Sequence, residues 1–229
     1  MADFDFKEFK KKFYTSGEEI CKEIYLKNQG SIQIKNEKRA IENLERIFNA
    51  VFTLSSKKGF QAMTMRDLSK EASMSMGGLY AYFKNKNDLL AIIHIQGSTM
   101  LKNVLERFEE YGNEPFEKLK FVIKAHIYLS EIARAWFFFS FMEARNLSPS
   151  ELKEVQELES YTEKVLVDIL INGEKKGAFK RKNHFLTASI IKAMQQDWYL
   201  KRWKYRKRGI SPDNFCDYVI EFVKSFTLA

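Results

Sequence analysis

Residues 64–90 of the chain have the sequence TMRDLSKEASMSMGGLYAYFKNKNDLL, and this stretch decides the fold. Thr64 is followed three residues later by Asp67, which is the spacing of a capping box, so we expect a helix over residues 65–72. The next three residues, Ser-Met-Ser, suit a turn, and a second short helix is expected over about 76–82. Two short helices joined by a tight turn predict a helix-turn-helix, in which the second helix enters the major groove of DNA.

The sequence on both sides of this stretch predicts two longer helices. Apolar residues recur with a 3.6-residue period from Asn36 onward. This helix is expected to end at Lys57-Lys58-Gly59, because two cations suit its last turn and a glycine suits the position after it. Phe60 is expected to pack back against the helix. Downstream, Asn85 to Asp88 provide the start of a long helix that runs towards Glu109.

The remaining chain also has the pattern of helices. Apolar side chains from Phe4 to Tyr25 are three to four positions apart and predict an amphipathic helix, before a break at 28–31. Ten Gly and three Pro leave few turns, and no segment longer than four residues alternates like a strand, so we expect an all-α fold. Gly173 and Gly177 mark a further expected break. Other helices, two of which begin at the capping pairs Ser148-Pro149 and Ser211-Pro212, are expected at about 115–131, 133–146, 150–172, 183–205 and 212–226.

Composition excludes several classes of protein. A formal net charge of +8, with 45% apolar and 14% aromatic residues, is typical of a globular chain rather than a disordered one. Cys21 and Cys216 are far apart and lack zinc-ligand spacing, so neither a metal site nor a disulfide framework is predicted. The N-terminus lacks the pattern of a signal peptide, and the most apolar stretch, residues 132–142, is too short to span a membrane. We expect a cytoplasmic protein that has no cofactor and does not act at membranes.

The second short helix has the features that DNA binding requires. Gly77 and Gly78 stand near its start, although a glycine inside a helix costs about 1 kcal/mol relative to alanine. The pair is therefore expected to allow close approach of the backbone to DNA. Residues 38–97 have a net charge of +4, about half of the excess in the whole chain. Hydroxyl and cationic groups that suit phosphates surround the helix: Thr64, Tyr80, Tyr82, Lys84 and Lys86.

This stretch resembles the DNA-binding domain of the TetR family of bacterial repressors. The matching segments are Gly59-Phe60, Thr64 to Ala72, and Gly78 to Leu90, within about 50 residues. The chain departs from the family pattern at Leu68-Ser69, where Ile-Ala is frequent, and at Ser73-Met74, where Gly-Val is frequent. Glycine usually supplies the unusual backbone angles of this turn, so the sequence leaves open how the turn is made with Ser73.

The resemblance implies roles for individual residues. Thr64 would cap the first helix of the motif and direct its amide end towards the DNA backbone. Few of the base-facing residues can make a bidentate contact, so Arg66 or DNA shape is expected to carry much of the specificity. Lys38 and Arg39 either reach the DNA or form a solvated helix start. Phosphate contacts are expected from Tyr80, Tyr82 and Lys86, with Lys84 close by, and base contacts from Ser75, Met76, Gly77, Gly78 and Ala81.

We expect three parts in the chain. These are an N-terminal helical extension (1–37), a three-helix DNA-binding domain (38–86) and a larger helical domain for effector binding and dimerisation (87–229). Apolar stripes over 150–172 and 183–203 are expected to form a homodimer interface, because a two-fold dimer matches a palindromic operator. A group of aromatic residues predicts either a large apolar effector pocket or ordinary core packing: Phe121, Tyr128, Trp136, Phe137, Phe138 and Phe141.

Two further features leave alternatives open. The segment 201–208 has six cations in eight residues, which suits either the phosphates of an acyl-CoA-like ligand or a solvated helix end. His94, His126 and His184 have no matching acid or nucleophile in the sequence, so an enzyme is not expected. The preferred function is a transcriptional regulator that binds double-stranded operator DNA and is released by a small-molecule effector. The alternative is an all-α ligand-binding protein or enzyme in which the helix-turn-helix is only structural.

Overall fold

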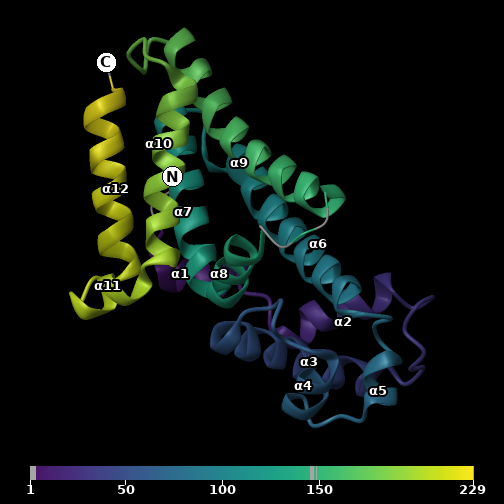
Figure 1. Cartoon of the computed structure of the whole chain (residues 1–229). Coiled ribbons are helices and arrows are strands. Elements are labelled where there is room, and N and C mark those ends of the chain that lie inside the picture. Colours follow the sequence, from purple (N-terminus) through teal and green to yellow (C-terminus); the bar gives the residue numbers. More distant parts are fainter. Residues whose placement is uncertain (1–3, 145–146, 148, 229) are drawn as a thin grey trace. The chain divides into compact units, whose positions relative to one another are not determined.

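The computed structural model describes residues 4–144, 147 and 149–228, and the chain is helical throughout this part (Figure 1). An all-α fold was expected and is confirmed, with a single isolated bridge between Phe179 and Leu228 among the described residues. The elements in chain order are α1 (Phe6–Phe13), α2 (Gly17–Lys27), α3 (Glu37–Lys58), α4 (Met65–Glu71), α5 (Met76–Tyr80), α6 (Lys86–Leu105), the 3-10 helix η1 (Glu106–Tyr111), α7 (Pro115–Ile132), α8 (Arg134–Glu143), α9 (Pro149–Lys175), α10 (His184–Leu200), α11 (Arg202–Lys207) and α12 (Pro212–Thr227).

The chain divides into two compact units. The smaller, which we call the helix-turn-helix unit, comprises Thr15–Ser98 and Phe138–Leu152. The larger unit comprises Met1–Tyr14, Thr99–Phe137 and Lys153–Ala229. No helix in the described part of the chain is both long enough and apolar enough to cross a membrane.

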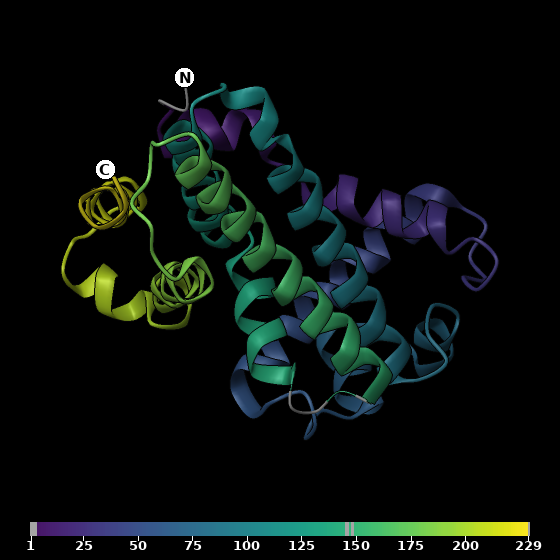
Figure 2. The same cartoon turned by 90° about the horizontal axis from the view of Figure 1, so that it is seen from above.

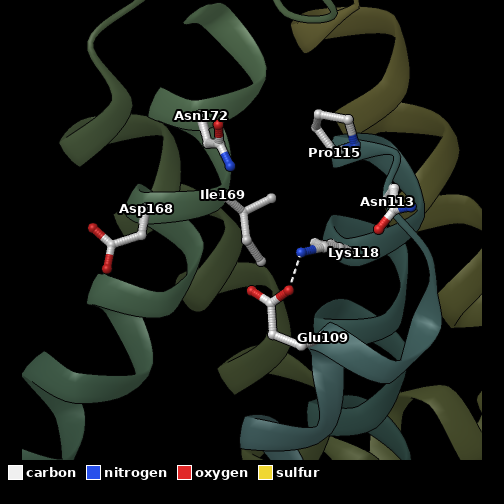
Figure 3. A pocket seen from close by; sticks show the side chains of 7 residues that line it. All are labelled: Glu109, Asn113, Pro115, Lys118, Asp168, Ile169 and Asn172. Atoms are coloured by element: carbon white, nitrogen blue, oxygen red, sulfur yellow. Dashed lines mark hydrogen bonds and ion pairs between the residues drawn. The ribbon is translucent and has the colours of Figure 1, made fainter. Parts of the chain in front are cut away.

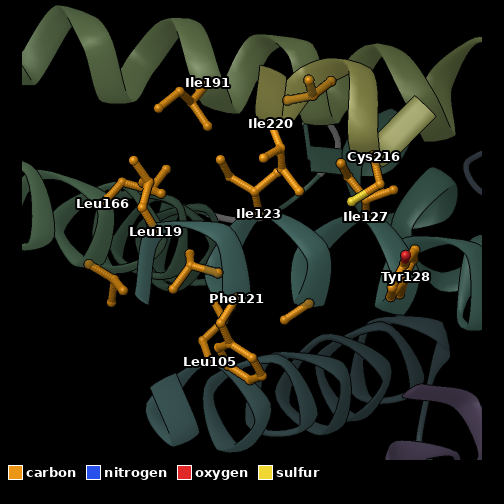
Figure 4. Close-up of a cluster of buried hydrophobic side chains, with 14 of the residues drawn as sticks. Leu105, Leu119, Phe121, Ile123, Ile127, Tyr128, Leu166, Ile191, Cys216 and Ile220 are labelled. Atoms are coloured by element: carbon orange, nitrogen blue, oxygen red, sulfur yellow. The ribbon is translucent and has the colours of Figure 1, made fainter. Parts of the chain in front are cut away.

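Helix α7 is the centre of the larger unit. Every residue from Phe121 to Ser130 is buried, so this part of the helix is covered on all of its faces. Leu119, Phe121, Ile123 and Ile127 are all buried, and their side chains meet those of neighbouring helices in Figure 4. Helices α1, α10 and α12 pack directly on α7. Seen from above, α10 and α12 are viewed almost end-on and are joined through α11 (Figure 2).

The N-terminal segment forms two helices, so the prediction of one amphipathic helix was wrong. The first ends at Tyr14, and a new capping box begins the second, because Ser16 and Glu19 bond each other's backbone amides. Helix α1 belongs to the larger unit, whereas α2 packs on α3 in the helix-turn-helix unit. The Phe9 ring lies 5.4 Å from that of Tyr128 on α7, centroid to centroid. The chain breaks between the two helices because each helix has its own N-terminal capping box, at Asp5 and at Ser16, which satisfies its first backbone amides.

Two other boundaries differ from the expected ones. A single helix over 183–205 was predicted, but α10 ends at Leu200, and Lys201 separates it from α11 with non-helical angles. The other predicted helix, 150–172, continues through Gly173 to Lys175, so Gly173 does not mark a break. The predicted cap Ser148 lies outside the described residues, whereas Ser211 caps α12 through Asn214 as expected.

Gly173 is explained by packing rather than by a turn. An added Cβ at this position would lie 2.0 Å from the Phe179 ring, which packs directly on the α9 backbone. Phe179 is buried, so its ring has little freedom to move away. Glycine has a low helix propensity, but at this position it allows the Phe179 ring to pack closely on the helix.

We expect Gly173→Ala to destabilise the larger unit despite the better helix propensity of alanine. Overpacking of this kind costs roughly 1–3 kcal/mol, which corresponds to about 2–4 °C per kcal/mol in a chain of this size. Thermal unfolding followed by circular dichroism measures the effect. Gly30→Ala is the control, since a Cβ there meets no atom within 4 Å. An unchanged melting temperature for Gly173→Ala would contradict the packing explanation.

Candidate nucleic-acid interface

Three capped helices form the core of the helix-turn-helix unit. The side chains of Asn36, Thr64 and Ser75 accept bonds from the first-turn amides of α3, α4 and α5. Leu68 of α4 and Leu79 of α5 are fully buried, which fixes the two short helices against each other. The capping box at Thr64 and the helix over 36–58 were both predicted and are confirmed.

The start of α4 is fixed by charge as well as by its cap. The Asp67 carboxylate accepts bonds from both the amide and the hydroxyl of Thr64 (2.8 and 2.7 Å). Lys58, at the end of α3, donates to the same carboxylate at 2.6 Å. The bond from Lys58, followed by those from Thr64, holds the pKa of Asp67 well below its ordinary value. This helix end therefore keeps an ionised carboxylate across the neutral range, and the partner of that carboxylate comes from α3.

The turn between α4 and α5 depends on an arginine of α3, Arg46. Ser73 has φ of +50°, in the left-handed region where glycine is usual. The guanidinium Nη2 of Arg46 donates to the carbonyls of Ala72 (2.6 Å) and Ser73 (2.7 Å). Ser69 Oγ donates to the Met74 carbonyl at 2.5 Å. These three bonds hold the turn in the conformation that a glycine would adopt without help.

The two glycines of α5 have different surroundings. A Cβ on Gly78 would lie 3.1 Å from Ser75 Oγ, so the cap of α5 itself restricts that position. A Cβ on Gly77 would meet no atom within 4 Å, and the residue is exposed. The packing of the protein therefore gives no reason for a glycine at 77.

The predicted DNA-contacting residues fall into two groups. Ala81 and Tyr82 are buried, and Met76, Gly78 and Lys86 are partly buried. The exposed members lie on α4, α5 and the segments that flank them. They are Thr64, Arg66, Ser75, Gly77, Tyr80 and Lys84.

Tyr82 and Lys86 both have partners inside the unit. The Tyr82 hydroxyl accepts a bond from Asn43 Nδ2 on α3 at 2.9 Å, and burial raises the pKa of this tyrosine. Lys86 Nζ donates to the carbonyls of Gln61 (2.8 Å) and Phe60 (3.3 Å), with its ammonium above the Phe60 ring. Both side chains hold elements of the unit together. The sequence analysis missed these partners because they lie about 25 to 40 positions away in the chain.

The aromatic residues expected to bind an effector are divided between the two units. In the larger unit Phe121, Tyr128 and Phe137 are buried and Trp136 is partly buried, and Tyr128 donates to Asp213 on α12 at 2.6 Å. In the helix-turn-helix unit Phe138 and Phe141 are exposed. Phe121 and Tyr128 are part of the hydrophobic core, which is the alternative that the sequence left open for them.

A small pocket lies in the larger unit between the start of α7 and the C-terminal part of α9. Its volume is about 90 Å³, enough for a few water molecules. The Lys118 ammonium bonds Glu109 across one side, and Asn172 and Ile169 face it from α9 (Figure 3). Most of the residues that line it are polar and its volume is small, so this pocket differs from the large apolar site that the sequence predicted.

Half of the cations in segment 201–208 form ion pairs, and these three cations share two acidic residues. Lys201 and Lys204 both bond Asp197, at 2.6 and 2.5 Å, and Arg202 bonds Glu131 at 2.8 Å. The other three cations, Arg206, Lys207 and Arg208, are exposed at the end of α11. A phosphate ligand on this segment would therefore meet three free cations rather than six.

The capped pair α4 and α5, with exposed cations around it, defines a helix-turn-helix DNA-binding protein. Two family models match the chain: bacterial regulatory proteins of the tetR family over residues 47–93, and the tetracyclin repressor-like C-terminal domain over residues 112–225. The chain belongs to the tetR family of bacterial regulatory proteins. It is a transcriptional regulator by family, and the matches confirm the resemblance drawn from residues 59–90.

Individual relatives agree with this assignment. The HTH-type transcriptional regulator HbdR of Aromatoleum sp. (strain CIB) is 25% identical over 183 residues, which are 76% of this chain and 76% of HbdR. The ketosteroid transcriptional regulator KstR2 of Mycobacterium tuberculosis has a similar fold, with a TM-score of 0.73 at 19% identity over 87% of this chain and 98% of KstR2. AibR, solved with isovaleryl coenzyme A and operator DNA, has a TM-score of 0.69 at 18% identity over 79% of this chain and 97% of AibR.

Two neighbouring lysines allow the structural role of Lys86 to be tested. We expect Lys86→Met to destabilise the helix-turn-helix unit by about 1–2 kcal/mol, because buried carbonyl groups lose a charged donor. Lys84→Met should leave the melting temperature unchanged, since Lys84 is exposed and its side chain bonds no described residue. Thermal unfolding of both variants measures the difference. Equal melting temperatures would show that the bonds of Lys86 add nothing to stability.

Proposed function

We propose that this regulator binds a palindromic operator as a homodimer, represses transcription from it, and is released by a small-molecule effector. The observation that carries the DNA-binding surface is Gly77. It is an exposed glycine in a helix where the protein itself leaves room for a side chain. A residue with this cost to helix stability and no internal purpose is expected where another molecule must approach the backbone.

The surface proposed for DNA contains the exposed members of the predicted set. Thr64, Tyr80 and Lys84 offer hydroxyl and ammonium groups to phosphates. Arg66 is exposed on α4, makes no ion pair with a described residue, and has the fork geometry that reads guanine. Lys38 and Arg39, at the exposed start of α3, add positive charge. With few other side chains able to read bases, we propose that Arg66 and DNA shape carry the specificity.

Tyr82 and Lys86 have an indirect role in this proposal. Their bonds to Asn43 and to the carbonyl groups of Phe60 and Gln61 hold α5 and the start of α6 in place. Phosphate contacts from these two residues would have to be made by the parts of the side chains that remain accessible. The exposed Tyr80 and Lys84 are therefore the better candidates for direct contact.

The proposed dimer interface lies on α10 and α12. Both helices pack on α7 with one face and expose large apolar side chains on another. Those of α12 follow the helical repeat, at Tyr218, Phe222 and Phe226, and exposed apolar groups of this size are typical of an interface. Expected interface residues on α9 serve a different purpose, since Val165, Leu166 and Ile169 are buried in the core of the chain. The exposed apolar residues of α10 are Phe185, Leu186 and Ile190.

The effector is proposed to bind in the larger unit and to be a small molecule with an apolar part. AibR was solved with isovaleryl coenzyme A, so a protein of this fold accepts an acyl thioester. Exposed cations at Arg206, Lys207 and Arg208 would suit the phosphates of such a ligand. Binding releases DNA if the effector favours a dimer whose DNA-binding units no longer match the operator half-sites.

Gly77→Ala separates DNA approach from stability. We expect the variant to fold with equal or greater stability, by up to about 1 kcal/mol, and to bind the operator at least roughly tenfold more weakly, which is about 1.4 kcal/mol. Gel shift against duplex DNA from upstream of its own gene measures affinity, with a scrambled duplex as the reference for specificity. Gly30→Ala should retain wild-type affinity. If wild-type protein does not distinguish the two duplexes, or if Gly77→Ala binds normally, the proposed surface is wrong.

Lys84→Met tests the phosphate contact on the same duplex. The affinity should fall for specific and scrambled DNA alike, and the slope of log K against log salt should become smaller by about one unit. Glu42→Gln, on the exposed side of α3, is the control and should keep the wild-type slope. An unchanged slope for Lys84→Met would remove Lys84 from the set of phosphate contacts.

The dimer interface is tested by adding charge to α12. Phe222 is 53% exposed, so Phe222→Arg should not disturb the fold of one chain, but it would bury a charge in the proposed interface. Light scattering after size exclusion should show a dimer for wild-type protein and a monomer for the variant. Leu26→Arg, on α2, changes a residue of similar exposure and should remain dimeric. A dimeric Phe222→Arg protein would place the interface elsewhere.

A further inference from the structure

The larger unit buries a lysine between three helices. Lys192 of α10 is 4% exposed, and its ammonium donates to Thr162 Oγ1 of α9 at 2.6 Å. His126 Nε2 of α7 lies 3.5 Å from the same nitrogen, and Glu159 Oε2 lies at 3.6 Å. Lysine is rarely buried to this degree without a close, well-bonded counter-charge, so its partners need to be examined one by one.

The acidic groups near Lys192 neutralise it incompletely. Glu159 is half exposed, at a longer distance than a normal hydrogen bond, and its other oxygen accepts a bond from Gln196 at 3.0 Å. Glu163 interacts only through its charge, and its carboxylate accepts a bond from Ser189. Burial lowers the pKa of Lys192, although both acids act in the opposite direction. Glu159 is thus the acidic partner of the ammonium group, at 3.6 Å, and its half-exposed carboxylate is shared with Gln196.

His126 has a donor without a partner. An ammonium group can only donate, so the Nε2 that faces Lys192 accepts, and the proton of the neutral ring is then on Nδ1. Burial and the neighbouring lysine hold the pKa of His126 well below its ordinary value, which keeps the ring neutral. His126 Nδ1 is buried and forms no hydrogen bond with any described residue.

Gln195 adds a second polar group without a partner. It is 1% exposed, and neither its Oε1 nor its Nε2 forms a hydrogen bond within the described chain. Residues 192 and 195 are three positions apart, so both lie on the inner face of α10. An unsatisfied buried polar group destabilises the fold, and a hydrophobic side chain would avoid that cost. Unpaired buried groups of this kind point to a use outside the fold of the free chain.

Aromatic side chains adjoin the polar cluster. The His126 ring lies 5.5 Å from Phe137 and 6.5 Å from Tyr199, and Trp136 packs edge-on against Phe137. The cluster thus combines a cation and two neutral N–H donors with an apolar wall. This combination suits a molecule with an anionic head and an apolar body.

We propose that Lys192, His126 and Gln195 bind the carboxylate of a small organic acid, and that this free acid is the effector. Lys192 supplies the counter-charge, and His126 Nδ1 and Gln195 Nε2 donate hydrogen bonds to the carboxylate oxygens. The rings of Phe137 and Tyr199 contact its apolar part. The effector role rests on the proposed function, whereas carboxylate binding does not. The proposal also selects a free acid over a coenzyme A thioester, which has no carboxylate at the acyl carbon.

The test compares three matched series of probes on the full-length protein. Straight-chain monocarboxylates from acetate to decanoate, together with benzoate, are measured by thermal shift and calorimetry against the corresponding primary amides and coenzyme A thioesters. We expect at least one acid to bind, and its amide and thioester to bind at least tenfold more weakly. Lys192→Met should weaken the acid at least tenfold, whereas Lys164→Met, an exposed lysine on α9, should not.

Separate control experiments distinguish effects on folding from effects on binding. Lys192→Met preserves side-chain length and removes a buried charge, so its melting temperature should not fall. Gln195→Leu is a second variant, expected to be stable and to bind the acid more weakly. Gel shift without ligand tests operator binding alone, and the bound acid should then weaken the complex with DNA. The inference is overturned if no acid binds, if thioesters or amides bind equally well, if Lys192→Met retains wild-type affinity, or if the acid leaves the DNA complex unchanged.

Discussion

The Arg46 guanidinium fixes the turn on which the DNA-binding surface depends. A left-handed serine is unfavourable, and only bonds from outside the turn compensate for it. Arg46 provides two of them, to the carbonyls of Ala72 and Ser73, and it reaches them from α3. The angle between α4 and α5, and therefore the position of Gly77 and Tyr80, follows from this contact. Where the family pattern has a glycine, this chain uses an arginine on a neighbouring helix to hold the same backbone conformation.

The parts of the fold that sequence predicted correctly are those determined by a few neighbouring residues. The caps at Thr64 and Ser211 depend only on residues three positions away, and the sequence predicts both of them. Gly173 shows the opposite situation. Its neighbours in sequence suggest a break, but the Phe179 ring that packs on it turns the same glycine into a contact inside a helix. Propensity describes the backbone alone, and tertiary packing overrides it.

The residues of the candidate site also differ in how far the sequence alone could predict them. Residue types identified Thr64 and Tyr80 as candidates, and the family resemblance added Arg66 and Ser75. The structure leaves all four exposed on or beside the two short helices. Spacing gave no means of separating Lys84 from Lys86, because both are cations within two residues of the start of α6. Only the carbonyl groups of Phe60 and Gln61, more than 20 positions away, distinguish the lysine that holds the fold from the one that faces solvent.

Charge acts differently in the two units. In the helix-turn-helix unit Arg66 and Lys84 are exposed without an ion-pair partner among the described residues, so their field extends into solvent, where it attracts phosphates. In the larger unit Asp197 and Glu131 neutralise the cations at the start of segment 201–208. Lys192 differs from both groups, because it is buried and its charge is only partly neutralised by Glu159. A positive charge held in this way attracts an anion strongly, because the low polarity around it weakens the field much less than water does. The formal charge of +8 therefore combines different physical situations. The cations open to ligands are the exposed ones, Arg206, Lys207 and Arg208 included, and the partly compensated Lys192.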